Sequence, residues 1–361
     1  MQGWFTFLAV IVALLYGPAP VAATEPAVTT PPRGPTPHVA LLLPTQASGF
    51  ARYADSVRQG VLAAAKVQGK GALPVTVYGM VDEDKDAVAN YDLAVSQGAR
   101  VVIGPMTRPG VSAIVAHGSI SVPTLALNPP DASLAMPPLL YVLGLQAEPE
   151  ARQVAAFAAS EGRRAALIVT ADSPLAKRIQ DAFAEAFEAQ GGHIVAVMKL
   201  GGDAKSGGKL RSTYGESGAD MIFVACDAQR ARFLRAFADR SSPFYGTSQL
   251  YATRGDVMTN SDLEGARFLD MPWMVQPDHP AVMIYPRPAA SASNEQERFY
   301  ALGIDAYRVS QTLLAAPAPA AATLDGVTGR IDLSAGQTFE RSLTPAEFGP
   351  DQPKAIDPFR P

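Results

Sequence analysis

The chain has 361 residues, of which 48% are hydrophobic, so it can bury two cores in domains of ordinary size. Its formal net charge of −4 gives no electrostatic basis for binding nucleic acid. Its one cysteine, Cys226, excludes a disulfide framework and a zinc cluster built from cysteines.

The N-terminal segment is typical of an export signal. An apolar run over residues 4–16 is too short to span a bilayer comfortably, and two prolines and small residues up to Ala23 follow it. We therefore predict a signal peptide over residues 1–23, cleaved near Ala23. Because no Lys or Arg precedes the run, a membrane anchor is the alternative. No cysteine follows the run, so we expect a periplasmic protein that is not a lipoprotein and has no stable membrane anchor. Five prolines then make residues 24–37 an extended linker.

From residue 38 onward, apolar runs of strand length alternate with apolar stripes at helical spacing. We expect strands at 39–43, 75–81, 101–103, 123–127, 165–170, 194–200, 221–225, 244–247, 266–269 and 329–333. We expect helices at 53–65, 87–97, 175–190, 210–216, 228–239 and 295–314, with two shorter ones after residues 109 and 149.

This alternation predicts an α/β protein with two doubly wound, Rossmann-like lobes joined by a hinge. We assign residues 38–146 and 280–329 to the first lobe. Residues 147–279 and 330–345 form the second lobe, and residues 346–361 form a flexible tail.

The stretch from Ala99 to Asp131 reads as strand, glycine turn, helix and strand, which is a βαβ unit. Ligands of open α/β sheets bind beyond the carboxyl ends of such strands, where the loop Gly104 to Pro109 lies. The free N–H groups at the following helix N-terminus favour an anion. A tight strand exit without a ligand is the alternative, and for the loop taken alone we favour it.

Two further segments have weak functional signals. The acidic run 82–86 could hold a metal, but acidic residues also complement the first turn of a helix, which we favour. The glycine-containing segment 201–209 matches neither a P-loop nor a dinucleotide fingerprint, so we expect a flexible surface loop.

Several sequence segments resemble those of known protein families. VALLLP, RQGVLAA, GARVVIGP and SVPTLALN resemble the type I periplasmic-binding-protein (Venus-flytrap) fold. TSQLYA, DLEGARFLDMPWM, RFYALGIDAYRV and LDGVTGRIDL resemble the C-terminal domain of the LpoA/LppC family, activators of penicillin-binding proteins. That family's activators also carry a lipidated cysteine and an N-terminal helical-repeat domain, and neither is found in this sequence.

The sequence favours a non-catalytic protein without a cofactor or metal. Its four histidines, His38, His117, His193 and His279, are scattered and have no ligand spacing. No nucleophile elbow or pair of catalytic carboxylates stands out.

Binding of an amino acid or similar small ligand, for an importer or sensor, is one reading. The possible cleft contacts are Thr45, Ser48, Thr107, Asn128, Asp227 and Gln249. Two prolines after Asn128 remove N–H donors from its loop, and Gln249 stands where an acidic partner for an ammonium group would be expected. Tight amino-acid binding is therefore not expected.

The other reading, which we favour, follows from the resemblance. It implies a periplasmic regulator that docks on a class A penicillin-binding protein and stimulates peptidoglycan synthesis. The sequence does not indicate which face would dock.

Overall fold

The computed structural model describes residues 35–200, 204–253, 257–288, 293–317, 319, 321–333 and 336–357. The expected signal peptide and residues 24–34 of the expected linker lie outside this part of the chain. Within it, no helix has both the length and the apolar character needed to cross a membrane.

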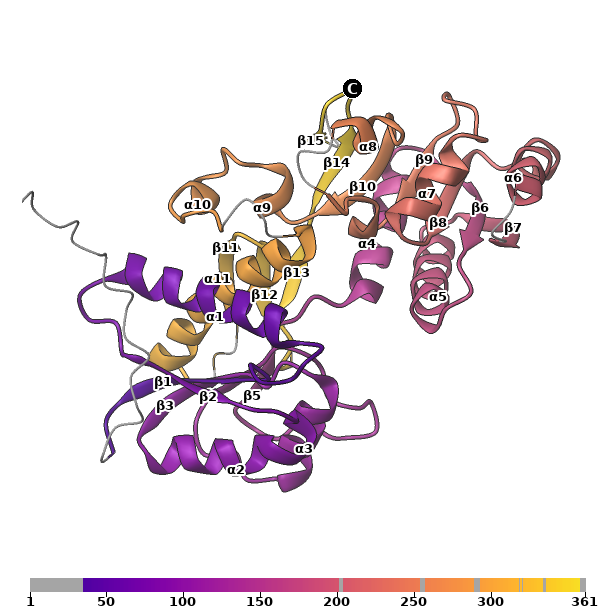
Figure 1. The fold of residues 1–361 in the computed structure, drawn as a ribbon. Helices are drawn as coiled ribbons and strands as arrows, with labels where there is room; N and C mark the ends of the chain where they lie inside the picture. Colours follow the sequence, from indigo (N-terminus) through magenta and orange to yellow (C-terminus); the bar gives the residue numbers. More distant parts are fainter. Residues whose placement is uncertain are drawn as a thin grey trace, which may run out of the picture. The chain divides into compact units, whose positions relative to one another are not determined.

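The first lobe is built on a parallel sheet with the strand order β2-β1-β3-β4-β5 (Figure 1). Its strands are β1 (His38–Leu43), β2 (Val75–Gly79), β3 (Ala99–Ile103), β4 (Thr124–Ala126) and β5 (Leu140–Val142). Every residue of β1 is buried, as expected for a strand with both faces covered. The connecting helices are α1 (Ala51–Gln68), α2 (Glu83–Ser96) and α3 (Arg108–His117).

The second lobe repeats this order. Its parallel strands run β7-β6-β8-β9-β10, and two antiparallel strands, β14 and β15, extend the sheet beyond β10. The strands are β6 (Ala165–Thr170), β7 (His193–Lys199), β8 (Met221–Ala225), β9 (Phe244–Gly246), β10 (Ala266–Asp270), β14 (Thr344–Phe348) and β15 (Pro353–Ala355). The helices are α4 (Ala147–Ser160), α5 (Pro174–Ala189), α6 (Ala204–Ser217), α7 (Ala228–Arg235), α8 (Val257–Ser261) and the 3₁₀ turn η1 (Ser248–Leu250).

Two expectations are wrong here. The tail, expected to be flexible from residue 346, forms β14 and β15, and Ala346 and Phe348 are buried against the second sheet. The sequence signal was weak because these strands are short and β15 begins at a proline. Residues 204–209, expected to be part of a flexible loop, are helical and open α6, whereas residues 201–203 lie outside the described part.

A third sheet has three antiparallel strands, and these strands do not pair with the strands of either lobe sheet. It consists of β11 (Ala322–Gly326), β12 (Gly329–Leu333) and β13 (Glu340–Ser342). The strand expected at 329–333 is present, but it pairs with β11 and β13 rather than with the second lobe's sheet to which we had assigned it.

The long helix α11 (Asn294–Ala315) runs beside α1 and against β3 and β4 of the first sheet (Figure 1). Two glycines permit this close approach. A Cβ atom on Gly60 would lie 2.0 Å from the carbonyl oxygen of Tyr300, and one on Gly303 would lie 2.1 Å from that of Val57. The pair therefore allows backbone-to-backbone contact that any side chain would prevent.

Local caps explain where several helices begin. Thr107 accepts a hydrogen bond from Gly110 N, and Ser173 accepts one from Ala176 N directly before a proline. At the start of α11, Ser293 and Gln296 form a reciprocal capping box. Asp82 likewise caps α2 by accepting from Asp84 N, so the acidic run 82–86 is the start of a helix. Among the described residues, no cluster of three or more metal-ligand side chains occurs.

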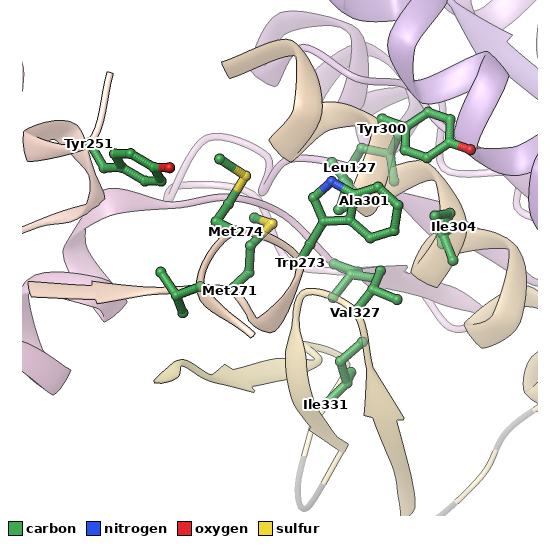
Figure 2. Packing of buried hydrophobic residues seen from close by; sticks show 14 of the residues in the cluster. Leu127, Tyr251, Met271, Trp273, Met274, Tyr300, Ala301, Ile304, Val327 and Ile331 are labelled. Carbon is green, nitrogen blue, oxygen red and sulfur yellow. The ribbon is translucent and has the colours of Figure 1, made fainter. Parts of the chain in front are cut away.

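Trp273 is the largest side chain buried where the chain passes from β10 to α11. It lies in the short helix α9 (Pro272–Val275), which α10 (Pro280–Met283) follows. Figure 2 shows its indole between Val327 of the β11–β12 turn and Tyr300 and Ile304 of α11. Its backbone N–H donates to Val327 O at 2.9 Å, and its indole N–H donates to Glu297 Oε2 at 3.1 Å. Trp273 thus ties α9, α11 and the third sheet into one core.

Candidate functional site

A cavity of about 820 Å³ is bounded by both lobes at the carboxyl ends of their parallel strands. On the first-lobe side, the lining comes from the loops that follow β3, β4 and β5. On the second-lobe side, it comes from the loops that follow β8, β9 and β10, and from the start of α5. A ligand-sized cavity at this edge of two doubly wound sheets is the site that the strand order predicts.

Four of the six predicted contacts line this cavity: Thr107, Asn128, Asp227 and Gln249. Thr45 and Ser48 do not. Thr45 sits beside Gly79, where its Oγ1 would lie 2.5 Å from a Cβ on that glycine, and Ser48 is exposed. The loop between β1 and α1 reaches the cavity with Phe50 instead, so the hydroxyls we expected there belong to another part of the surface.

The anion-favouring loop after β3 is already occupied by the protein itself. Glu83, which is 3% exposed at the start of α2, accepts hydrogen bonds from Met106 N at 3.0 Å and from Thr107 N at 2.6 Å. Burial raises the pKa of Glu83, while these backbone donors act in the opposite direction. The N–H groups of Met106 and Thr107, in the loop before α3, therefore hold an internal carboxylate.

The second lobe uses the same device. Glu150, in the first turn of α4, accepts from both the backbone N–H and the hydroxyl of Ser248, in the loop after β9. Burial raises the pKa of Glu150 from its ordinary value of 4.5 to about 7, although the hydrogen bonds from Ser248 lower it. Asp270 adds to the increase by charge repulsion, whereas Arg298 opposes it. This carboxyl therefore takes up a proton at a higher pH than an exposed glutamate does.

The other acidic groups of the lining have cationic partners. Asp270 forms a two-armed ion pair with Arg298, with Oδ2 2.5 Å from Nη2 and Oδ1 3.1 Å from Nε. Burial alone would lower the pKa of Arg298, but Asp270 outweighs that effect and raises it. Asp227, considered above as an ammonium partner, caps α7 and is ion-paired with Arg230 of the same helix.

Arg298 also secures the loop after β9, because its Nη2 donates to the carbonyl oxygens of Ser248 and Tyr251, both at 3.0 Å. These contacts join the TSQLYA segment to Asp270 of DLEGARFLDMPWM. A parallel case is Asp305 of the ALGIDAYRV segment, which is fully buried and accepts from Val327 N and Thr328 N. The motifs that carried the family resemblance therefore meet around the segments that connect the lobes.

Sequence reasoning missed Glu83, Glu150, Arg298 and Arg341, all of which shape the cavity or its loops. Glu83 and Glu150 each stand at a helix start, where an acidic residue is ordinary, so spacing alone gave no sign of a distant backbone partner. The two arginines lie in segments far from the strand ends in sequence, and only the passage of the chain between lobes brings them to the site.

The strand order of both lobes and the cavity between them define a two-lobed α/β protein with the fold of type I periplasmic binding proteins. The chain belongs to the LppC family, described as "LppC putative lipoprotein", whose profile matches residues 32–212 and 203–350.

Three comparisons place this chain among proteins with different descriptions. It is 23% identical to the penicillin-binding protein activator LpoA of Vibrio cholerae, over 86% of this chain and 57% of the relative. A structure described as a "putative branched-chain amino acid ABC transporter" from Chromobacterium violaceum is 38% identical, with a TM-score of 0.76, over 86% of this chain and 100% of that one. The LpoA C-domain of Haemophilus influenzae, described as a regulator of PBP1A, is 19% identical with a TM-score of 0.73, over 89% and 100% of the two chains.

The chain thus spans little more than half the length of the curated relatives that it matches. Those relatives are named as activators, and the H. influenzae domain is described as a regulator, rather than as catalysts.

Proposed function

We propose that this protein is a non-catalytic periplasmic regulator that docks on a class A penicillin-binding protein and stimulates peptidoglycan synthesis. The observation that carries the proposal is the match of the LppC family across residues 32–350, which includes both lobes and the segments between them. The relatives named LpoA carry that role in their names, and this chain covers 57% and 59% of two of them. It covers the whole of the LpoA C-domain of H. influenzae.

The cavity supports this reading over uptake of a free amino acid. An amino-acid zwitterion needs donors for its carboxylate and an acid for its ammonium group, since burying either charge unpaired costs several kcal/mol. The backbone donors after β3 hold Glu83, and Asp227 is paired with Arg230. A protein partner, in contrast, requires only a surface and no such pocket.

We further propose export to the periplasm with cleavage near Ala23 and without lipid attachment. The apolar run 4–16 and the small residues after it support cleavage, and the one cysteine, Cys226, is buried at the end of β8. Mass spectrometry of the protein from a periplasmic extract tests both points. An N-terminus near Thr24 with an unmodified mass is expected, and an intact Met1 or a mass increased by acyl chains would contradict it.

The test of function is a titration of the cognate synthase with the purified chain, with glycan polymerisation and peptide crosslinking followed separately. We expect at least one rate to rise with concentration and saturate, together with a complex in a pull-down. Heat-unfolded protein and a synthase of another class serve as controls. Unchanged rates at saturating protein, with no complex, would overturn the proposal.

A second candidate is solute binding, which the 38% identity to the C. violaceum protein favours through that protein's description. Calorimetry against the twenty amino acids, on refolded protein freed of carried-over ligand, separates the two. We expect no micromolar binding, and a dissociation constant near 1 μM for any amino acid would favour the solute-binding role.

A further inference from the structure

The acidic side chains that line the cavity all have partners in the protein, whereas not all of the positive side chains are ion-paired with the described residues. Among its acidic lining residues, Asp270 is paired with Arg298, Glu148 with Arg178 and Asp227 with Arg230. The remaining two acids are held by neutral donors. Glu150 accepts from Ser248, and Glu295 accepts from the hydroxyl of Tyr53 at 2.6 Å. The acids are therefore all satisfied by groups of the protein itself.

Two arginines of the lining, Arg108 and Arg341, are the contrasting case, because neither forms an ion pair with the described residues. Arg341 lies in the middle of β13 and, unlike Arg108, is held in place by hydrogen bonds to the protein. Its Nε donates to Gly144 O at 3.0 Å, and its Nη1 donates to Thr328 O at 3.2 Å. Burial lowers the pKa of Arg341, although the charges of Glu150, Asp305 and Asp270, none of them bonded to it, act in the opposite direction. Its positive charge is thus positioned by two carbonyl groups and left without a counterion in contact.

The backbone of Arg341 and of Leu343 is held by hydrogen bonds to a side chain of α4. Gln153 of α4 donates to Arg341 O at 2.8 Å and accepts from Leu343 N at 2.8 Å. The side chain therefore cannot leave the cavity without breaking contacts to Gly144, in the segment before α4, and to the β11–β12 turn. A group held in this way is preorganised for a ligand rather than free to fold back on itself.

The rest of the lining indicates what else the ligand contains. The side-chain amides of Gln146 and Gln249 form no hydrogen bond with the described residues, so each offers a donor and an acceptor. Asn128 uses one donor on Met106 O at 3.3 Å. Apolar side chains complete the wall: Phe50, Met106, Leu127, Leu145, Met271, Phe299 and Leu343.

We propose that this cavity binds an N-acylated amino acid carboxylate, which is the chemistry of the C-terminus of a short peptide. The guanidinium of Arg341 receives the carboxylate, Gln146 and Gln249 hydrogen-bond the amide groups, and the apolar wall packs against the side chains. A free amino acid lacks the amides and brings an ammonium group for which the lining has no unpaired partner. The inference stands apart from docking on a synthase, because it concerns only this chain and a small molecule.

The test is calorimetry on the whole chain with three N-acetyl dipeptides, dialanine, leucyl-leucine and diphenylalanine, each as the free acid and as the C-terminal amide. We expect at least one acid to bind with a dissociation constant below about 1 mM, and its amide to bind about tenfold or more weakly. Equal affinities for acid and amide, or no binding by any of the acids, would overturn the proposal.

Variants assign the effect to residues. Arg341→Gln is expected to remove the preference for the acid, whereas Arg330→Gln, at an exposed arginine on the neighbouring strand β12, retains it. Because Arg341 also bonds two carbonyl groups, Arg341→Lys and Gln249→Ala provide milder changes. The lysine variant keeps part of the preference, and Gln249→Ala weakens acid and amide alike by a few fold. A preference that survives Arg341→Gln in folded protein would contradict the assignment.

Discussion

The two lobes share one strand order but differ in how their sheets end. In the first lobe, the parallel sheet stops at β5, while in the second lobe β14 and β15 continue the sheet in antiparallel fashion. At the cavity, however, the lobes converge on one solution. In the first lobe, Glu83 accepts from two backbone N–H groups of a strand-exit loop, and in the second lobe Glu150 accepts from one backbone N–H and one hydroxyl of such a loop. Strand-exit loops of this fold class can offer backbone N–H groups to a ligand. In this protein, glutamate side chains of the chain itself accept hydrogen bonds from those N–H groups.

This comparison separates the lobes from the region between them. In each lobe a glutamate of that lobe accepts hydrogen bonds from a strand-exit loop, and in the second lobe Arg298 of α11 also bonds this loop. The connecting region, in contrast, depends on residues from three parts of the chain, of which Trp273, Asp305 and Arg341 are examples. We therefore expect substitutions in the connecting region to have larger effects than substitutions in the first-lobe loop.

The largest effect is expected for Trp273→Ala. Trp273 is fully buried and contacts both α11 and the third sheet, so the cavity left behind should reduce the free energy of unfolding by about 3–5 kcal/mol. Urea unfolding followed by circular dichroism measures it. Met283→Ala, at a side chain that is 65% exposed in the same segment, is the control and should change stability by less than about 0.5 kcal/mol. A loss below 1 kcal/mol for Trp273→Ala would break the comparison.

Glu150 predicts a pH dependence. Its pKa is higher in the folded chain, so the folded state binds more protons, and stability from this group is complete below pH 4.5 and is lost as pH rises through about 7. The shift corresponds to on the order of 3 kcal/mol. Glu150→Gln should flatten the decline in unfolding free energy between pH 5 and 8, whereas Glu148→Gln should leave it. An unchanged slope in Glu150→Gln would show that other groups cause the dependence.

Glu83→Ala tests the first-lobe counterpart. It leaves the N–H groups of Met106 and Thr107 without their carboxylate, and we expect a loss of about 1–3 kcal/mol in the free energy of unfolding. Asp84→Ala, at the exposed neighbouring position, is the matched control. Equal stability of the two variants would mean that water replaces the carboxylate at no cost, and would weaken the parallel with Glu150.

The smallest effect is expected at Thr107. Its hydroxyl accepts from Gly110 N at 3.3 Å and caps α3, so Thr107→Ala should reduce the free energy of unfolding by about 1 kcal/mol. Thr107→Ser keeps the hydroxyl and should restore most of the loss. If the serine variant is as unstable as the alanine variant, the methyl group rather than the cap stabilises this loop.

Much of the fold could be predicted from the sequence because buried parallel strands are continuous apolar runs. β1, β6 and β8 are of this kind, and each lies where the pattern indicates. The strands that were missed, β5, β11, β13, β14 and β15, have three to five residues each, and two of the five residues of β11 are exposed. Their pairing depends on partners far along the chain, such as β10 for β14, which periodicity does not indicate.

The sequence predicted where the candidate site lies, but not which hydrogen bonds and ion pairs its residues form. Strand order and strand exits located Thr107, Asn128, Asp227 and Gln249 at the cavity. What those side chains do was not predictable, because Asp227 is used by Arg230 of its own helix and the loop donors are used by Glu83. Arg341 lies within the short strand β13, in a segment with no motif of its own, so only tertiary structure brings it to the wall of the cavity.

The late position of β14 has a consequence for the order in which the protein can become complete during its synthesis. β10 ends at Asp270, yet the strand that covers its outer edge begins at Thr344, and the helix that covers the first sheet begins at Asn294. A chain that has emerged only as far as residue 290 would therefore have an open strand edge in one lobe and an uncovered apolar face in the other. Such surfaces invite pairing with other chains. A nascent or truncated molecule should thus depend on a holding factor until α11 and β14 have been made, a requirement that the finished protein no longer has.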